Sequence, residues 1–473
     1  MPSCLDDYVD GEHFCRVISA FTESLNMSEL GFKYANTKET GRKPFDPRMM
    51  LNLYIYGYLN RVRSSRRLEM EASRNIEVMW LLNKMVPDDR TIANFRKDNA
   101  SALKKSFRAF IKMLKKLELF GAKVVALDGT KIRANNNNYL NYDKKSAQEA
   151  LNKIDKKIAD YMKLLDESDK ENEIEVTPDK ERLKKAIKIL STKKYKIEKI
   201  LPKIETNGNV ALIDTDARLM NQAGDSKGSG VSYNVQSVVD AENGLVVDFD
   251  VTSKSSDMGE GNLNTMSKKA KEALEVDEIT LLADMGYYRG EEMVACEEEQ
   301  NVTLIIPKPN RDSNKRDKSL DPNFAFEYFT YNKEKDCYIC PMGQELSFRY
   351  INKYRNRHRR VYVNRKACHN CLYSSKCTTA ECKSISREEY QDALDIIDER
   401  TRSNAELCRK RKAIVEHPFG TVKKIWGYSQ FLCRTKSKVS AEMSLAFFAY
   451  NLRRVLTLFG TEIKSLIQKV QAM

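Results

Sequence analysis

The sequence has no run of about 18 apolar residues, the length that a membrane-spanning helix needs. It contains only 11 prolines and 19 glycines among 473 residues, which excludes a collagen-like chain or a long disordered linker. The first residues, MPSCLDDYVDGEHFCRV, are acidic and lack a long apolar core, so we expect no signal peptide. These absences predict a soluble intracellular protein.

Positive charge is in excess, because 81 Lys and Arg residues stand against 67 Asp and Glu, a formal net charge of +14. This length corresponds to roughly two to four domains, and 41% hydrophobic residues suffice for large cores. A basic chain favours an anionic partner, of which nucleic acid is the commonest. A solvated lysine-rich surface would give the same excess, so charge alone does not identify the partner.

The cysteines are clustered, since six of the 11 lie between residues 337 and 382. Two C-x2-C pairs occur in this short, polar and basic segment, and such pairs let two thiolates bind one tetrahedral ion. A disulfide network would need an oxidising compartment, of which the sequence gives no sign. We therefore predict a structural zinc site of the zinc-ribbon type. The first ligand set is Cys340, Cys368, Cys371 and Cys377, and the substitutes are Cys337, Cys382 and His369.

Residues 44–100 have the pattern of short helices separated by brief turns. Pro44 and Pro47 open an apolar run, and Asp88 or Asp89 is expected to cap a later helix. This arrangement fits a small helical DNA-binding domain, although an ordinary helical bundle with solvated arginines is the alternative. The candidate DNA contacts are Arg63, Arg66, Arg67 and Arg90, with Arg96 nearby.

Residues 143–205 are dense in Lys, Glu and Asp, contain no glycine and have regularly spaced Ile and Leu. The pattern predicts two helices broken near Thr177-Pro178, forming an antiparallel helical hairpin. We interpret this segment as a solvated spacer inserted in a domain. The chain around it alternates strand and helix patterns, including the strands GVSYNVQSVVD, ITLLAD and NVTLIIPKP.

Two carboxylates end apolar strands. Asp128 follows KVVAL and Asp284 follows ITLLA, and each is followed by a glycine within two residues. Strand ends open to a crevice, and carboxylate oxygens are the ligands that Mg²⁺ prefers. A third acid, Glu416, lies on a very basic helix, and we expect a helix break directly after it at His417-Pro418. A helical salt bridge is the alternative role for Glu416.

Other acids of the predicted sheet compete for a metal role. Asp214-x-Asp216 is similar to the start of a calcium loop, but Arg218 and Leu219 stand where a ligand and the turn glycine belong. We expect these acids to be solvated. They are Asp214, Asp216, Asp240, Asp248 and Asp250.

At the level of motifs, the sequence resembles the DDE transposases of bacterial insertion sequences. ALDGTKIRAN and LLADMGYYRGEEM resemble the motifs of the two aspartates, and VEHPFGTVKKIWGYSQF resembles the glutamate motif. KPFDPRMMLNLYIYGYLNRV with PDDRTIANFR resembles the helical N-terminal domain of that family, and CPMGQEL with CHNCLYSSKC resembles the cysteine-rich insertion of one branch. The likeness covers roughly residues 30–456.

The resemblance implies an RNase H-like core in which Asp128, Asp284 and Glu416 bind two Mg²⁺ (or Mn²⁺) ions, with Lys423 contacting DNA near the cleavage site. Arg409 and Lys412 stand where related sequences often have Tyr and Arg, so phosphate contact is kept without the bidentate fork of Arg at the second position.

The activity that the resemblance implies is metal-dependent cleavage at terminal inverted repeats, followed by transfer of the 3′-OH into target DNA. A homodimer on double-stranded DNA is expected, in the bacterial cytoplasm and associated with the nucleoid when bound. The alternatives are a domesticated or inactive relative that acts as a sequence-specific DNA-binding protein, and a metal-dependent nuclease without strand transfer.

The predicted fold class is α/β, with an RNase H-like mixed sheet, a helical N-terminal domain, a helical-hairpin insertion and a zinc-ribbon-like insertion. Residues 1–121 are assigned to the helical DNA-binding domain. Residues 122–309 form the first part of the catalytic core, including the spacer 143–205. The cysteine-rich insertion spans 310–384, and residues 385–473 form the C-terminal helices of the core.

Overall fold

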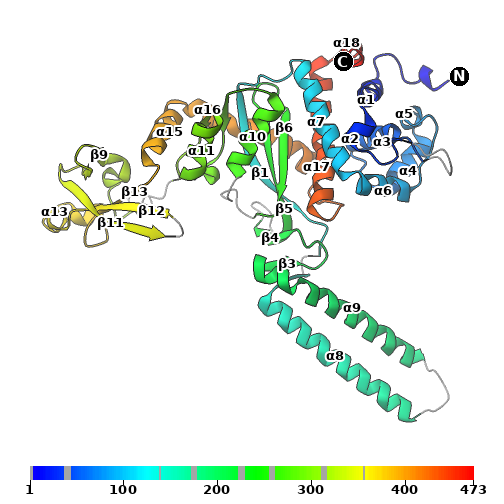
Figure 1. The fold of residues 1–473 in the computed structure, drawn as a ribbon, viewed down its shortest axis with the longest axis horizontal. Coiled ribbons are helices and arrows are strands. Elements are labelled where there is room, and N and C mark those ends of the chain that lie inside the picture. The colour runs from blue at the N-terminus through cyan, green and yellow to red at the C-terminus, as the bar shows by residue number, and fades with distance from the viewer. Residues whose placement is uncertain are drawn as a thin grey trace.

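The computed structural model describes residues 4–36, 44–137, 140–171, 178–221, 229–254, 262–309, 317–354 and 357–473. The fold is mixed α/β, with a central sheet flanked by helices and three attached parts: a helical region, a small β-rich region and a long helical hairpin (Figure 1). Within the described ranges, no helix is long and apolar enough to cross a membrane.

The N-terminal region is helical, as predicted. Its third helix begins where Asp46 accepts a hydrogen bond from the backbone N of Arg48 at 2.8 Å. A Cβ on Gly57 would lie 2.6 Å from the backbone O of Val62, so glycine permits this helix to approach the next turn. The helices are α1 (Phe14–Glu23), α2 (Met27–Leu30), α3 (Pro47–Leu59), α4 (Ser65–Arg74), α5 (Ile76–Leu81), α6 (Asp89–Asp98) and α7 (Ala100–Lys116).

This region shares one hydrophobic core with the C-terminal helices α17 (Lys436–Phe459) and α18 (Ile463–Gln471). Phe448 on α17 stacks on Phe110 of α7, with ring centroids 4.0 Å apart, and also contacts Phe21 of α1. The two ends of the chain are therefore joined by packing, and Figure 1 shows α17 beside α7.

A buried carboxylate ties a loop to this shared core. Glu442 of α17 has a side chain only 2% exposed and accepts hydrogen bonds from the backbone N of Leu432 and of Cys433, at 3.0 and 2.8 Å. Arg63 completes the group, because its Nη1 lies 3.3 Å from Glu442 and its guanidinium lies 4.1 Å from the ring centroid of Tyr428. Arg63 thus stabilises the contact between α17 and the helical region.

Glu442→Ala will lower the free energy of unfolding by about 3 kcal/mol, because two backbone N–H groups and Arg63 lose their buried acceptor. Urea unfolding measured by circular dichroism checks this. The control is Glu462→Ala at an exposed position, for which we expect a change within about 0.5 kcal/mol. Equal effects of the two substitutions would contradict the structural role of Glu442.

The central sheet is mixed. Its middle strand is antiparallel to one neighbour and parallel to the other, and the sheet order is β4-β5-β1-β7-β8, with β6 also paired to β5. Nearly the whole of β5 is buried, as expected for an inner strand. The strands are β1 (Val124–Arg133), β4 (Arg218–Asn221), β5 (Ser229–Asp240), β6 (Val246–Thr252), β7 (Ile279–Leu282) and β8 (Val302–Ile305).

Helices cover both faces of this sheet. Val125 and Leu127 of β1 pack with α10 (Asn262–Leu274) and α11 (Gly290–Gln300). Ala126 points to the opposite face, because side chains alternate along a strand. There it packs with Leu282 and with Val415 of α16 (Ala405–Phe419).

The cysteine-rich segment forms a five-stranded antiparallel sheet, in the order β13-β12-β11-β10-β9. Its last strand differs from expectation, since we assigned residues 385–473 to the C-terminal helices of the core. Ile385 and Arg387 alternate inward with strand periodicity, and helix α15 (Gln391–Ser403) begins only afterwards. The strands are β9 (Thr330–Asn332), β10 (Cys337–Ile339), β11 (Glu345–Tyr354), β12 (Arg357–Val363) and β13 (Ser384–Glu388).

The charged spacer contains two long helices, α8 (Lys144–Glu171) and α9 (Pro178–Asn207), which run side by side and project from the core (Figure 1). At their base the short strands β2 (Asn141–Asp143) and β3 (Asn209–Ala211) pair antiparallel. α9 begins at Pro178, and the predicted break at Thr177 lies outside the described residues.

Candidate active site and cysteine cluster

Asp128 and Asp284 lie at matching positions of adjacent parallel strands. In the pairing of β1 with β7, Ala126 is opposite Leu282, and each aspartate stands two residues further along its own strand. Neighbouring strands are about 4.8 Å apart, and residues two apart point to the same face. Both aspartates are therefore directed to the face that α16 covers.

Each aspartate is oriented by the glycine that follows it. The Oδ1 of Asp128 accepts a hydrogen bond from the backbone N of Gly129 at 2.8 Å. Asp284 caps the short 3-10 turn Met285–Tyr287, and its Oδ1 accepts from the backbone N of Gly286 at 2.7 Å. These local contacts fix the carboxylates at the sheet edge, where both remain partly exposed.

Glu416 lies on α16, one residue after the buried Val415 that contacts Ala126 and Leu282. Its side chain is 63% exposed, and its Oε1 is 3.8 Å from the Nζ of Lys412. In the part of the chain that the structure describes, Asp128 and Asp284 belong to no group of three ligand atoms that all lie within 4.8 Å of one another. In this structure Glu416 therefore contacts Lys412 and does not form a compact ligand group with the two aspartates.

The predicted helix break after Glu416 is wrong. α16 continues through Pro418 to Phe419 and passes directly into a π-helical turn, Gly420–Ile425. The wider turn absorbs the irregularity that we expected at the proline; such turns are frequent at functional sites. Lys423 lies in this turn, and its Nζ donates to the backbone O of Lys131 on β1 at 2.8 Å.

Arg411 is a residue of this region that sequence reasoning missed. Its Nη1 lies 4.0 Å from the Oδ2 of Asp128, and the side chain is only 17% exposed. That Nη1 atom is buried and has no hydrogen-bond partner. Arg411 stands one helical turn before Val415, so the sheet-facing side of α16 was the signal that could have identified it.

The predicted DNA contacts fall into two groups. Arg409 and Lys412 are exposed on the same side of α16 as Glu416. Arg66, Arg67 and Arg90 are exposed on the helical region, with the Nε of Arg66 3.4 Å from the Oδ2 of Asp89. Arg63, by contrast, is occupied inside the protein by Glu442 and Tyr428.

Four of the cysteines line one small cavity of about 40 Å³ in the β-rich insertion. They are Cys340, Cys368, Cys371 and Cys377, whereas Cys337 and Cys382 do not line it. Within the described ranges, these four Sγ atoms supply no group of three lying within 4.8 Å of one another, so the cysteines surround a shared space without tight clustering.

The cavity has features of a metal-binding turn. The backbone N of Gln344 donates to the Sγ of Cys340 at 3.3 Å, and Gly343 takes the left-handed conformation (φ +76°) that this turn requires. Burial raises the pKa of Cys377 to about 11 and also raises the pKa of Cys368. Ionising these thiols therefore needs a compensating cation.

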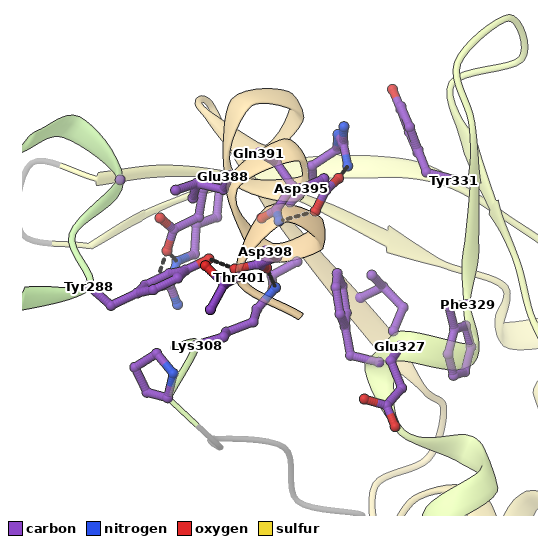
Figure 2. Close-up of a pocket in the computed structure, with 18 of the residues that line it drawn as sticks. Tyr288, Lys308, Glu327, Phe329, Tyr331, Glu388, Gln391, Asp395, Asp398 and Thr401 are labelled. Atoms are coloured by element: carbon purple, nitrogen blue, oxygen red, sulfur yellow. Dashed lines mark hydrogen bonds and ion pairs between the residues drawn. The ribbon is translucent and has the colours of Figure 1, made fainter. Parts of the chain in front are cut away.

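A larger cavity of about 950 Å³ lies between the core and the insertion (Figure 2). On one wall Asp398 of α15 accepts hydrogen bonds from Tyr288 at 3.0 Å and from Lys308 at 2.8 Å. Tyr288 follows Asp284 by four residues, but neither Asp128 nor Asp284 lines the cavity. Its further lining mixes aromatic and basic side chains, among them Phe326, Tyr331, Arg359 and Arg402.

Two family models match parts of the chain. Residues 3–98 match the model of a transposase domain (DUF772), and residues 339–456 match that of the transposase DDE domain. Together the two matches support a DDE-type transposase of an insertion element. No curated protein and no solved structure matches the chain.

Proposed function

We propose that this protein cleaves phosphodiester bonds at transposon ends and transfers the freed 3′-OH into target DNA. The observation that carries the proposal is the register of β1 and β7, which pairs Ala126 with Leu282, two residues before Asp128 and two residues before Asp284. This pairing supports a shared site for the two aspartates. The order β6-β5-β1-β7-β8, in which β5 is antiparallel to β1 and β7 is parallel to it, supports an RNase H-like core.

The donor set fits a hard divalent cation, because both aspartates offer carboxylate oxygens, Asp128 from within β1 and Asp284 from just after β7. Asp128, Asp284 and Glu416 would hold two Mg²⁺ (or Mn²⁺) ions. When bound, these ions activate the attacking oxygen and stabilise the leaving one. Glu416 must then exchange its contact with Lys412 for the site.

The basic residues around this edge would bind the DNA backbone. Arg409 and Lys412 are exposed beside Glu416, and Arg66, Arg67 and Arg90 are exposed on the helical region. We assign the first pair to phosphates near the cleavage site and the second group to the transposon end, with the protein acting as a homodimer on double-stranded DNA.

Cys340, Cys368, Cys371 and Cys377 would hold a structural Zn²⁺, because four thiols that share one cavity match its tetrahedral preference. The insertion buries only a small apolar cluster, centred on Tyr338 and Tyr362. A metal would thus supply stability that this core lacks.

The function is tested with purified protein, a duplex carrying one end of the element, and a target plasmid. We expect a nicked 3′ end and joined products in Mg²⁺, and neither in EDTA. Cleavage without joined products would reduce the function to a nuclease. Binding to the element end without cleavage in Mg²⁺ or in Mn²⁺ would indicate a DNA-binding protein without nuclease activity.

Arg411→Met is expected to tighten Mn²⁺ binding by at least about tenfold, because it removes a positive charge 4.0 Å from Asp128. Electron paramagnetic resonance of free Mn²⁺ measures the affinity. The control is Lys410→Met, which removes a charge whose Nζ lies 2.8 Å from Glu406 and should change the affinity less than about twofold. Weaker binding by Arg411→Met would show that Arg411 supports the site instead of opposing the metal.

A further inference from the structure

The helical hairpin has an uneven charge. α9 contains ten Lys and Arg residues against four acidic ones, whereas α8 contains seven of each. The two helices have nearly equal length and belong to the same projection, so their compositions compare directly. The excess of positive charge lies on α9 alone.

The lysines of α9 form a continuous surface, which we name the basic face of α9. With 3.6 residues per turn, five of them fall within roughly a quarter of the helix circumference and extend for about 27 Å. All five are exposed. They are Lys185, Lys188, Lys196, Lys199 and Lys203.

The adjacent side of α9 is used for folding. Ile197, Ile200 and Ile204 are buried against α8, and Lys194 pairs with Asp155 across the hairpin at 2.5 Å. The Nζ of Lys185 lies 3.6 Å from the Oε2 of Glu181 on the same helix, whereas in the described part of the chain no carboxylate lies within 4.0 Å of the Nζ of Lys188 or Lys196. The basic face is therefore only partly neutralised by the hairpin itself.

The hairpin follows the end of β1 at Arg133, five residues beyond Asp128. β1 contains Asp128 and continues to Arg133, and the chain then enters β2 and α8. Figure 1 shows the hairpin leading away from this end of the sheet. α8, with 28 residues, reaches about 42 Å from its base. DNA whose cleavage site is at Asp128 and Asp284 would meet this arm as it leaves the core.

We propose that the basic face of α9 binds the phosphate backbone of duplex DNA beyond the cleavage site. This inference rests on the proposed function, which brings DNA to that end of the sheet. The 27 Å length spans about eight base pairs, and lysines that neutralise phosphates release counterions and so strengthen binding. Two α9 helices from different copies would repel each other, so a second copy of this chain is the less suitable occupant.

The test uses the full chain with Lys185, Lys188, Lys196 and Lys199 all replaced by Gln, which keeps the helix propensity. Fluorescence anisotropy follows its binding to a mixed-sequence duplex of about 50 base pairs, in EDTA, between about 50 and 200 mM KCl. We expect the slope of log K against log[KCl] to become shallower by about 2 to 4, with at least tenfold weaker binding at about 100 mM KCl.

The matched control replaces Lys153, Lys156, Lys157 and Lys163 of the neutral helix α8 by Gln, and its slope should change by less than about 1. Replacing the four α9 lysines by Arg should keep the wild-type slope, which separates charge from misfolding. An unchanged slope in the α9 Gln variant overturns the proposal. So does a change in oligomeric state, measured by sedimentation, that occurs without a change in slope. Binding is measured in EDTA and so does not depend on cleavage. If the α9 Gln variant changes the slope but the wild-type protein does not cleave DNA in Mg²⁺, the proposed function is contradicted and the role of α9 is kept.

Discussion

Asp284→Asn and Asp128→Asn will each lower the rate of DNA cleavage by at least about 1,000-fold, while duplex binding changes less than about twofold. Asn preserves the shape of the side chain and its contact with the backbone N of the following glycine. It removes one negative charge from a site that must hold divalent cations, and this loss corresponds to about 4 kcal/mol in the barrier. A gel assay of nicking at an element end measures the rate.

The control is Asp250→Asn on β6 of the same sheet. The Oδ1 of Asp250 lies 3.3 Å from the Nζ of Lys269. Asp250 is separated from β1 by β5, and the register puts its side chain on the opposite face of the sheet from Asp128. We expect wild-type cleavage from it. Full activity of Asp128→Asn, or equal losses in all three variants, would contradict the assignment of the two aspartates.

Cys368→Ser and Cys371→Ser will each abolish zinc binding and unfold the insertion, because a structural zinc site supplies folding energy of about 10 kcal/mol or more. The wild-type protein is expected to contain one zinc per chain by inductively coupled plasma mass spectrometry. Limited proteolysis should then cut both variants between residues 317 and 388, while the central sheet resists cleavage.

Matched controls come from the same segment. Cys337 is buried on β10 and Cys382 lies near the cavity, but neither lines it. Cys382→Ser should therefore keep its zinc, and Cys337→Ser should keep zinc with a modest loss of stability. If zinc is lost from Cys382→Ser but kept in Cys371→Ser, Cys382 replaces Cys371 in the ligand set. A wild-type protein without zinc would refute the site.

The sequence was sufficient to single out the two aspartates, because each follows an apolar stretch and is followed by a glycine within two residues. The prediction that Asp128 ends its strand is wrong, since β1 continues to Arg133. The pairing of β1 with β7 needed the structure, since it joins residues that are 156 positions apart in the chain. The sequence also did not predict which side of α16 faces the sheet. Val415 packs between Ala126 and Leu282, and this contact determines that Arg411 faces Asp128 while Glu416 is exposed.

Other differences have similar causes. Pro418 predicted a helix break, but the π-helical turn that follows accommodates it within a continuous helix. Residues 384–388 adopt a strand because β12 offers an edge for pairing, a long-range contact that local periodicity does not report. Arg63 was expected at DNA for its charge, and its partner Glu442 is 379 residues away in the chain.

The central claim is that Asp128 and Asp284 together form a divalent metal site. Mn²⁺ titration of the intact protein, followed by electron paramagnetic resonance, tests it without depending on DNA or on catalysis. The account predicts saturable Mn²⁺ binding that is lost in Asp128→Asn and in Asp284→Asn and is kept in Asp250→Asn. Undiminished Mn²⁺ binding in both of the first two variants would contradict it.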